Sequence, residues 1–276
     1  MSFWELYGTA KAFIKDIIDD RITGLAAEQA FFYMLSLFPM IILFLAVLPY
    51  FSMDIDRLMQ FIDTLLPQET ADMVQENVFS IVSETNRGLL TFGIIGTLWS
   101  ASSGVNAFIR AMNQAFDVEE PRPFWKTRSL SILLTIGLMA SFIVIFALSI
   151  FGELILHTIS RYIFLPGALQ DVLQMMRWIV TVLVMISILS VLYFLAPYKK
   201  LTYRYVLPGA VAAMLMWLAV SYGFSFYVTN FSNYSSTYGS LGGVIALMLW
   251  LFLTGLALVI GGEINAHIHK KRITHR

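Results

Sequence analysis

The stretch Tyr238–Ala266, YGSLGGVIALMLWLFLTGLALVIGGEINA, decides the class of this protein. Within it, the run from Leu241 to Gly262 contains no charged residue, and the acidic Glu263 follows this run directly. A helix needs about 20 apolar residues to cross the roughly 30 Å hydrocarbon core of a bilayer. Soluble proteins seldom bury so long an uninterrupted apolar run. We therefore predict that this stretch crosses a membrane.

Five further stretches have the same character and predict an all-α, polytopic membrane protein with a single transmembrane domain over residues 1–276. The predicted spans are residues 27–51, 88–113, 130–156, 178–196, 206–228 and 241–262. Residues 3–18 have helical apolar spacing, which is typical of an amphipathic helix in the membrane interface or of one docked on the rest of the protein. Residues 55–65 and 71–82 predict short helices in the first loop, and Pro39 predicts a kink.

Composition excludes several classes of function. The chain is 58% hydrophobic and 13% charged, whereas soluble domains carry about 25% charged residues. It has 18 basic and 18 acidic residues, so no basic excess points to nucleic acid, and it lacks the cysteines needed for disulfides, thiol catalysis or Cys-bound metal. Its first 24 residues do not follow the pattern of a cleaved signal peptide. We expect membrane lipids as its surroundings and no cofactor.

The distribution of Lys and Arg predicts the orientation. Fourteen of the 18, counting Arg110 near the end of the second span, lie before the first span, after the second, after the fourth and after the last, and four lie on the opposite side. Basic residues are enriched in cytoplasmic loops, so both termini should be cytoplasmic and joined by six membrane spans.

A polar stripe runs along the second span. Its members recur at spacings of four and three residues and are Trp99, Ser103, Asn106, Arg110 and Asn113. Lipid cannot satisfy such groups, so the stripe should face the bundle interior or a wet cavity. It lines a substrate path in one interpretation, and in the other it is packed at the bundle centre with its polar groups paired.

Charges near the inner ends of three spans form a second candidate site. Glu28, Arg110 and Glu263 should lie near the cytoplasmic leaflet, where an unpaired charge is costly. We predict that Arg110 neutralises Glu28, Glu263 or both. Such a cluster either positions helices or acts as a gate, a proton site or a phosphate-binding site.

On the opposite side, residues 222–240 are dense in Tyr, Phe, Asn and Ser. The predicted outer rim consists of Tyr227, Asn230, Asn233, Tyr234 and Tyr238. Aromatic rings with polar tips suit the boundary between membrane and water, and they also suit recognition of a sugar or lipid head group.

Catalytic and metal motifs are not visible. The sequence contains no HExxH, GxSxG or P-loop, and His267 and His269 have no acidic neighbour except Glu263. We therefore predict no enzyme activity, no catalytic residues and no metal site.

Four segments carry a resemblance to a known family. They are AAEQAFFY at residues 26–33, the run from Leu89 to Phe116, YVLPGAVAAMLMW from Tyr205 and the run from Asn230 to Ala266. The chain resembles the YihY/BrkB family of bacterial inner-membrane proteins, once labelled ribonuclease BN. That resemblance implies six membrane-spanning helices and a role in transport or in envelope lipids, and it assigns no catalytic residue.

Three functions are consistent with these patterns. The leading hypothesis is a transporter of a lipid or another amphiphile, with a path formed by the first, second and sixth spans. The second is a scaffolding membrane protein without transport activity that assembles as a homo-oligomer through its small-residue faces. A membrane-bound hydrolase or ribonuclease is the third and the weakest.

Overall fold

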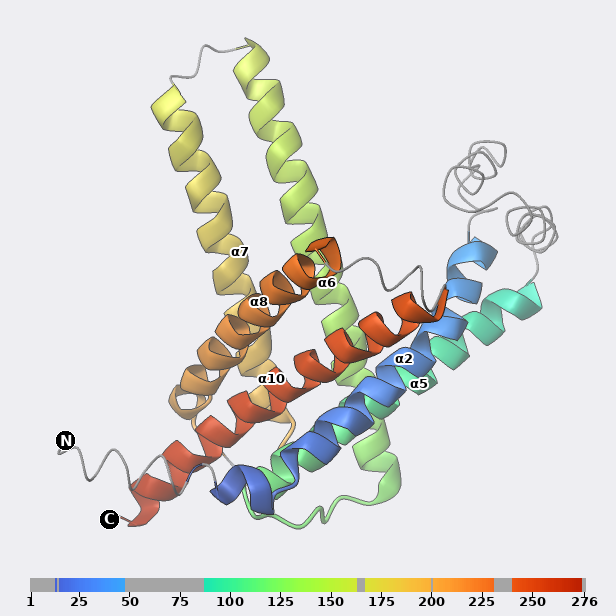
Figure 1. Ribbon diagram of the computed structural model, residues 1–276, viewed down its shortest axis with the longest axis vertical. Coiled ribbons are helices and arrows are strands. Elements are labelled where there is room, and N and C mark those ends of the chain that lie inside the picture. Colours follow the sequence, from blue (N-terminus) through green and yellow to red (C-terminus); the bar gives the residue numbers. More distant parts are fainter. Residues whose placement is uncertain are drawn as a thin grey trace. The chain divides into compact units, whose positions relative to one another are not determined.

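The computed structural model describes residue 13 and residues 15–47, 87–162, 167–199, 201–230 and 240–274. Within these ranges the regular structure is helical, and no β-strand occurs. The long helices are α2 (Ile22–Val47), α5 (Arg87–Ala115), α6 (Phe124–Tyr162), α7 (Gly167–Leu195), α8 (Leu207–Asn230) and α10 (Ser240–Thr274), and a short 3-10 helix, η2 (Tyr203–Tyr205), precedes α8 (Figure 1).

Every predicted span corresponds to one of these helices. Among the residues described, six helices are long and apolar enough to cross a membrane. Many of their large apolar side chains are exposed, including Phe44, Phe142 and Trp178. In water such a surface would drive aggregation, but in a bilayer it contacts acyl chains. The prediction of an all-α protein with six membrane-spanning helices is confirmed.

Several helices are longer than the apolar stretches that predicted them. The third begins at Phe124 rather than at residue 130, the fourth at Gly167 rather than at residue 178, and the last continues to Thr274. Apolar length measures the part of a helix that lies in hydrocarbon. It does not mark the helix ends, because Lys, Arg, Glu and Gln continue a helix readily into water.

Two predicted features fall largely beyond the description. Of the predicted amphipathic segment 3–18, the structure describes residues 13 and 15–18, which are helical. The chain then turns through Asp20 and Arg21 into α2, with Arg21 at a positive φ of 51°. The predicted loop helices at 55–65 and 71–82 lie outside the described residues.

The chain divides into two compact units. One comprises Phe32–Ala101 and the other combines Met1–Phe31 with Ser102–Arg276. Both α2 and α5 contribute residues to each unit. A single transmembrane domain therefore stays a prediction.

In the unit Phe32–Ala101, α2 and α5 approach closely at two glycines. A β-carbon added to Gly93 would lie 2.8 Å from the Cα of Leu43, and one added to Gly96 would lie 3.0 Å from the Cβ of Pro39. Small residues at helix contacts let backbones pack within a membrane, where burial of apolar side chains provides little driving force. These glycines therefore set the spacing of the two helices.

The larger unit is built around the contact of α8 with α10. Gly209 on α8 faces the carbonyl oxygen of Gly261 on α10 so closely that no side chain fits between them. One turn further along α10, the side-chain Oδ1 of Asn265 accepts a hydrogen bond from the Gly209 N–H at 2.7 Å, and its Nδ2 donates to the Val206 carbonyl at 3.1 Å. Asn265 thus satisfies the Gly209 N–H, a donor in the first turn of α8 that has no partner within the helix, and adds a second hydrogen bond to the Val206 carbonyl, which also accepts one from the Ala210 N–H.

The same core extends to α5 and α7. Tyr193 on α7 is fully buried, donates its hydroxyl to the Leu258 carbonyl on α10 at 2.6 Å, and packs against Phe108 on α5 with ring centroids 5.6 Å apart. Ile109, Met112 and other apolar side chains complete this core. The core also includes Ile22 of α2 and Leu134 of α6, so it draws residues from all six long helices.

A left-handed residue ends α5. Asp117 has a φ of 51°, its N–H bonds to the Gln114 carbonyl at 2.9 Å, and the Val118 N–H bonds to the Asn113 carbonyl at 2.9 Å. This pairing is a Schellman motif, in which glycine is the usual left-handed residue and Asp or Asn is better tolerated than most others.

Candidate functional site

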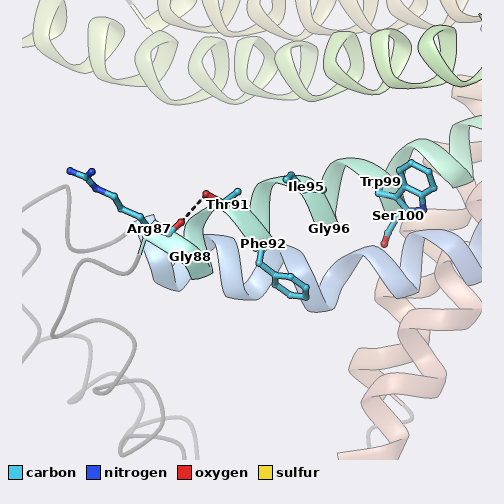
Figure 2. Close-up of a pocket in the computed structure, with 8 residues that line it drawn as sticks. All are labelled: Arg87, Gly88, Thr91, Phe92, Ile95, Gly96, Trp99 and Ser100. Carbon is cyan, nitrogen blue, oxygen red and sulfur yellow. Dashed lines mark hydrogen bonds between the residues drawn. The ribbon is translucent and has the colours of Figure 1, made fainter. Parts of the chain in front are cut away.

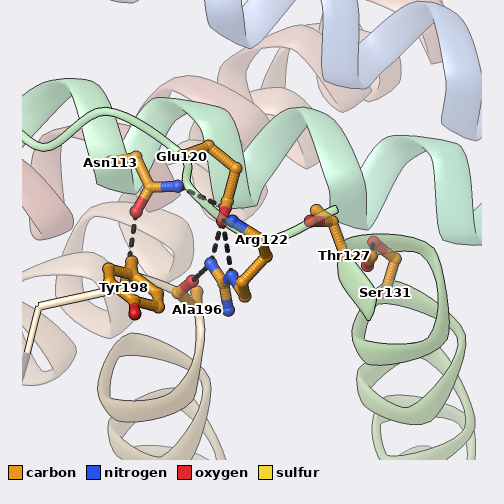
Figure 3. Close-up of polar contacts among 7 residues, drawn as sticks. All are labelled: Asn113, Glu120, Arg122, Thr127, Ser131, Ala196 and Tyr198. Carbon is orange, nitrogen blue, oxygen red and sulfur yellow. Dashed lines mark hydrogen bonds and ion pairs between the residues drawn. The ribbon is translucent and has the colours of Figure 1, made fainter. Parts of the chain in front are cut away.

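The last residue of the predicted polar stripe, Asn113, belongs to a network that fixes the end of α5 (Figure 3). Its Nδ2 donates to Glu120 at 2.7 Å, and its Oδ1 accepts from the Tyr198 N–H at 2.8 Å. Arg122 forms two bonds of 2.6 Å to the Glu120 carboxylate and donates to the Ala196 carbonyl at 3.0 Å. The network ties the loop after α5 to the end of α7.

Glu120 stands at the centre of this network. Partial burial alone would raise the pKa of its carboxyl group, but hydrogen bonds from Arg122 and Asn113 outweigh burial and hold that pKa below its ordinary value. Glu120 is therefore ionised at neutral pH. The sequence patterns did not single out this pair, although the two-residue spacing of Glu120 and Arg122 in the loop between two predicted spans was a usable signal.

The middle of the stripe has mixed surroundings. Ser103 accepts a hydrogen bond from Arg128 on α6 at 3.1 Å, and the Arg128 side chain is buried. Asn106 lies between Ser103 and Arg110, and its buried Oδ1 has no hydrogen-bond partner among the residues that the structure describes. Arg110 forms an ion pair with Glu28 on α2, and both side chains remain partly exposed.

Glu263, the third member of the predicted charge cluster, lies apart from that ion pair. Its side chain is 1% exposed, and neither carboxylate oxygen has a hydrogen-bond partner within the described ranges. The structure thus pairs Arg110 with Glu28 and gives Glu263 no such partner. The sequence left open whether Arg110 neutralises Glu28, Glu263 or both, and the structure shows the pair with Glu28.

Other charged residues surround Glu263. Asp16, Asp20, Asp117 and Lys270 all lie within electrostatic range of its carboxyl group. Lys270 binds Asp117 at 2.6 Å, and His267 approaches Asp16 at 3.3 Å. Glu263, His267 and Lys270 follow one another at helical spacings of four and three, and this pattern could have identified the group from sequence.

The pKa of Asp20 shows how burial and the neighbouring charges act on one acid of this group. Burial raises the pKa of its carboxyl group, and the neighbouring Asp117 and Asp16 raise it further, while Lys270 and Gln114 act in the opposite direction. The result lies above the ordinary value. Burial is therefore the main reason that the raised pKa of Asp20 favours its protonated form.

In the unit Phe32–Ala101, an open groove of about 700 Å³ follows the first half of α5 (Figure 2). It extends from Arg87 and Gly88 past Phe92 and Ile95 to Trp99 and Ser100. Trp99, the first residue of the predicted stripe, is 56% exposed here. The groove presents apolar side chains with a guanidinium group at one end, which suits an elongated apolar molecule carrying an anionic head.

The predicted outer rim is described only in part. Tyr227 lies partly buried on α8, which ends at Asn230. Asn233, Tyr234 and Tyr238 lie outside the described residues. Among the residues described, no three His, Asp or Glu side chains are grouped so that they could hold a metal ion.

Comparison with the sequences of known proteins assigns this chain to a family. The sequence profile described as Virulence factor BrkB matches residues 13–276. The chain belongs to the BrkB family. The resemblance noted in the sequence is thereby confirmed, and the protein is an integral, multi-pass membrane protein.

Its relatives are bacterial proteins matched over most of their length. A protein of Bacillus subtilis named YfkH, whose name describes it as ribonuclease-like, is 43% identical over 90% of this chain and 90% of its own. A UPF0761 membrane protein of Aliivibrio salmonicida is 28% identical over 91% of this chain and 80% of its own, and one from Pseudoalteromonas atlantica is 27% identical over 92% and 84%. No solved structure matches this BrkB-family chain.

Proposed function

We propose that this protein lies in the bacterial cytoplasmic membrane and transports a lipid or another amphiphile. The observation that carries the proposal is the groove along α5, in which Phe92, Ile95 and Trp99 form an apolar wall beside Arg87. An acyl chain fits the wall, and an anionic head group fits the guanidinium, which forms strong hydrogen bonds with phosphate and carboxylate.

The polar half of α5 provides the second part of the path. Beyond Trp99, the helix presents Ser103, Asn106 and Arg110 in successive turns. The buried Oδ1 of Asn106 is unbonded among the described residues, so it would accept a hydrogen bond from a head group once the path opens and exposes it. With both termini in the cytoplasm, as the Lys and Arg distribution favours, the groove faces the outer leaflet and Arg110 lies near the inner one.

Transport can be tested with purified protein in liposomes that contain fluorescent phospholipids. A quencher that does not cross the membrane measures how much lipid moves between leaflets, and mass spectrometry identifies amphiphiles that copurify. Trp99→Ala and Arg87→Gln should slow movement and reduce the bound lipid. Trp178→Ala, which removes an exposed tryptophan of α7, is the matched control and should have no effect.

Lipid movement that is no faster than in protein-free liposomes, together with no copurifying amphiphile, would contradict the proposal. Retention of full activity in both α5 variants would contradict the path. An assay of RNA cleavage by the same sample tests the activity that the name of YfkH suggests.

A scaffolding role is the second candidate, and one observation favours it. Ser103, Arg110 and Asn113 each have a side-chain partner in the structure, as expected of a packed and paired helix. A scaffold predicts a stable homo-oligomer in detergent and native-like lipid, without lipid movement. Measurement of mass in nanodiscs, combined with the liposome assay, separates the two functions.

A further inference from the structure

Glu263 is a buried acid that the proposed path does not use. It lies on α10 directly after Gly262, where an added β-carbon would collide with the thioether of Met112 on α5. Its side chain is 1% exposed, and both carboxylate oxygens are shielded from solvent. In the described part of the chain, neither oxygen has a hydrogen-bond donor.

The cations near Glu263 already have acidic partners. Lys270, two turns along α10, binds Asp117, and His267 contacts Asp16. Arg110 on α5, which the sequence offered as a partner of Glu263, is instead paired with Glu28 on α2. Lys270 and Arg110 are therefore neutralised by other carboxylates, and a protonated His267 would be neutralised by Asp16.

Among the described residues whose charges act most strongly on Glu263, acids outnumber cations. The segment before α2 contributes Asp16 and Asp20, and the turn after α5 contributes Asp117. Against these three acids stand Lys270 and, when protonated, His267. Repulsion from neighbouring carboxylates adds to the cost of ionising Glu263.

An ionised carboxylate without donors is far more costly to bury than a neutral carboxylic acid. Two kinds of ligand can remove the charge, a metal cation or a proton. A metal cation needs several oxygen ligands, and no suitable group of three exists among the described His, Asp and Glu side chains. A proton needs only one of the two oxygens of Glu263.

We propose that Glu263 is a proton-binding site, which holds one proton in the folded protein at neutral pH and releases it when the cluster at the end of α10 opens to water. The inference does not depend on transport, because it concerns the acid and its surroundings only. Ionisable groups buried in spans serve as proton relays in pumps and transporters. Glu263 is thus the group through which proton movement can be linked to movement of another molecule.

Infrared spectroscopy of the full-length protein in lipid nanodiscs tests this proposal. A protonated carboxyl group has a carbonyl band that is separate from the carboxylate bands. At neutral pH we expect one such band per chain, and it should shift when the protein is produced with carbon-13-labelled glutamate. Glu263→Gln should remove the band, whereas Glu28→Gln, the control at the paired glutamate, should retain it.

A second variant keeps the test decisive if Glu263→Gln does not fold. Glu263→Asp retains an acid at the site, so the band should persist but lose its sensitivity to labelled glutamate. Absence of the band from the wild-type protein at neutral pH would overturn the proposal, as would its persistence in Glu263→Gln. Loss of the band when choline is replaced by sodium would also overturn it, because a cation would then occupy the site.

Discussion

Replacement of Gly209 by alanine should loosen the contact between α8 and α10. The new methyl group would lie 2.5 Å from the side chain of Asn265 and closer still to the carbonyl oxygen of Gly261. Overpacking costs about 1–3 kcal/mol. Loss of the two Asn265 hydrogen bonds removes about 2 kcal/mol, and the better helix propensity of alanine returns about 1 kcal/mol. We expect a net destabilisation of about 2–4 kcal/mol.

The matched control is Gly223→Ala on the same helix. An added β-carbon there meets nothing within 4 Å, so only the propensity gain of up to about 1 kcal/mol applies. Reversible unfolding of both variants in mixed micelles, followed by circular dichroism, gives the two changes in free energy. The double variant with Asn265→Ala should be less destabilised than the sum of the single variants, because the residues share hydrogen bonds.

Equal stability of Gly209→Ala and Gly223→Ala would refute this reasoning. So would additive effects of the changes at 209 and 265. Either result would mean that α8 and α10 are not held together by this close backbone contact.

Three further predictions concern the larger unit. Asp117→Gly should relieve the left-handed strain by about 1 kcal/mol, and it loses only a weak, exposed ion pair to Lys270. Thermal unfolding should therefore show a net gain in stability. A loss of stability similar to that of Asp117→Ala would contradict the cap. The pKa of Glu120 is lower in the folded protein than in the unfolded chain, where it is near 4.5. The carboxylate therefore stabilises the fold above pH 4.5, and this stability is lost as the pH falls through the pKa of the folded state. Stability measured from pH 7 to pH 3 should depend less on pH in Glu120→Gln, and an unchanged profile would exclude the bond to Arg122. Tyr193→Phe should cost about 1 kcal/mol, because it removes a buried hydroxyl donor to a carbonyl of α10, and a neutral result in the same unfolding assay would argue against that bond.

The length of the apolar runs was enough to predict an all-α membrane protein from the sequence. The number of spans follows from the runs around residues 27–51 and 241–262, because hydrocarbon thickness imposes a minimum length. The helix ends did not follow. After Gly262, α10 continues through basic residues to Thr274. A helix in water can contain charged residues, so the end of the apolar run does not mark the end of the helix.

The candidate site was only partly readable. Helical spacing placed Trp99 and Asn113 on one stripe, but it could not show that one lines an exposed groove and the other bonds to Glu120. Such partners come from loops far along the chain, and their positions depend on tertiary packing. The choice of Arg110 between Glu28 and Glu263 was undecidable for the same reason.

The continuation of α10 beyond Gly262 has a mechanical consequence. With 35 residues, this helix is roughly 52 Å long, whereas the hydrocarbon it crosses is about 30 Å thick. A stiff rod of this length amplifies small rotations, since tilting it by about 10° displaces one end by about 9 Å relative to the other. A small tilt of α10 within the bilayer would therefore displace its aqueous end far enough for a soluble protein to distinguish the two positions.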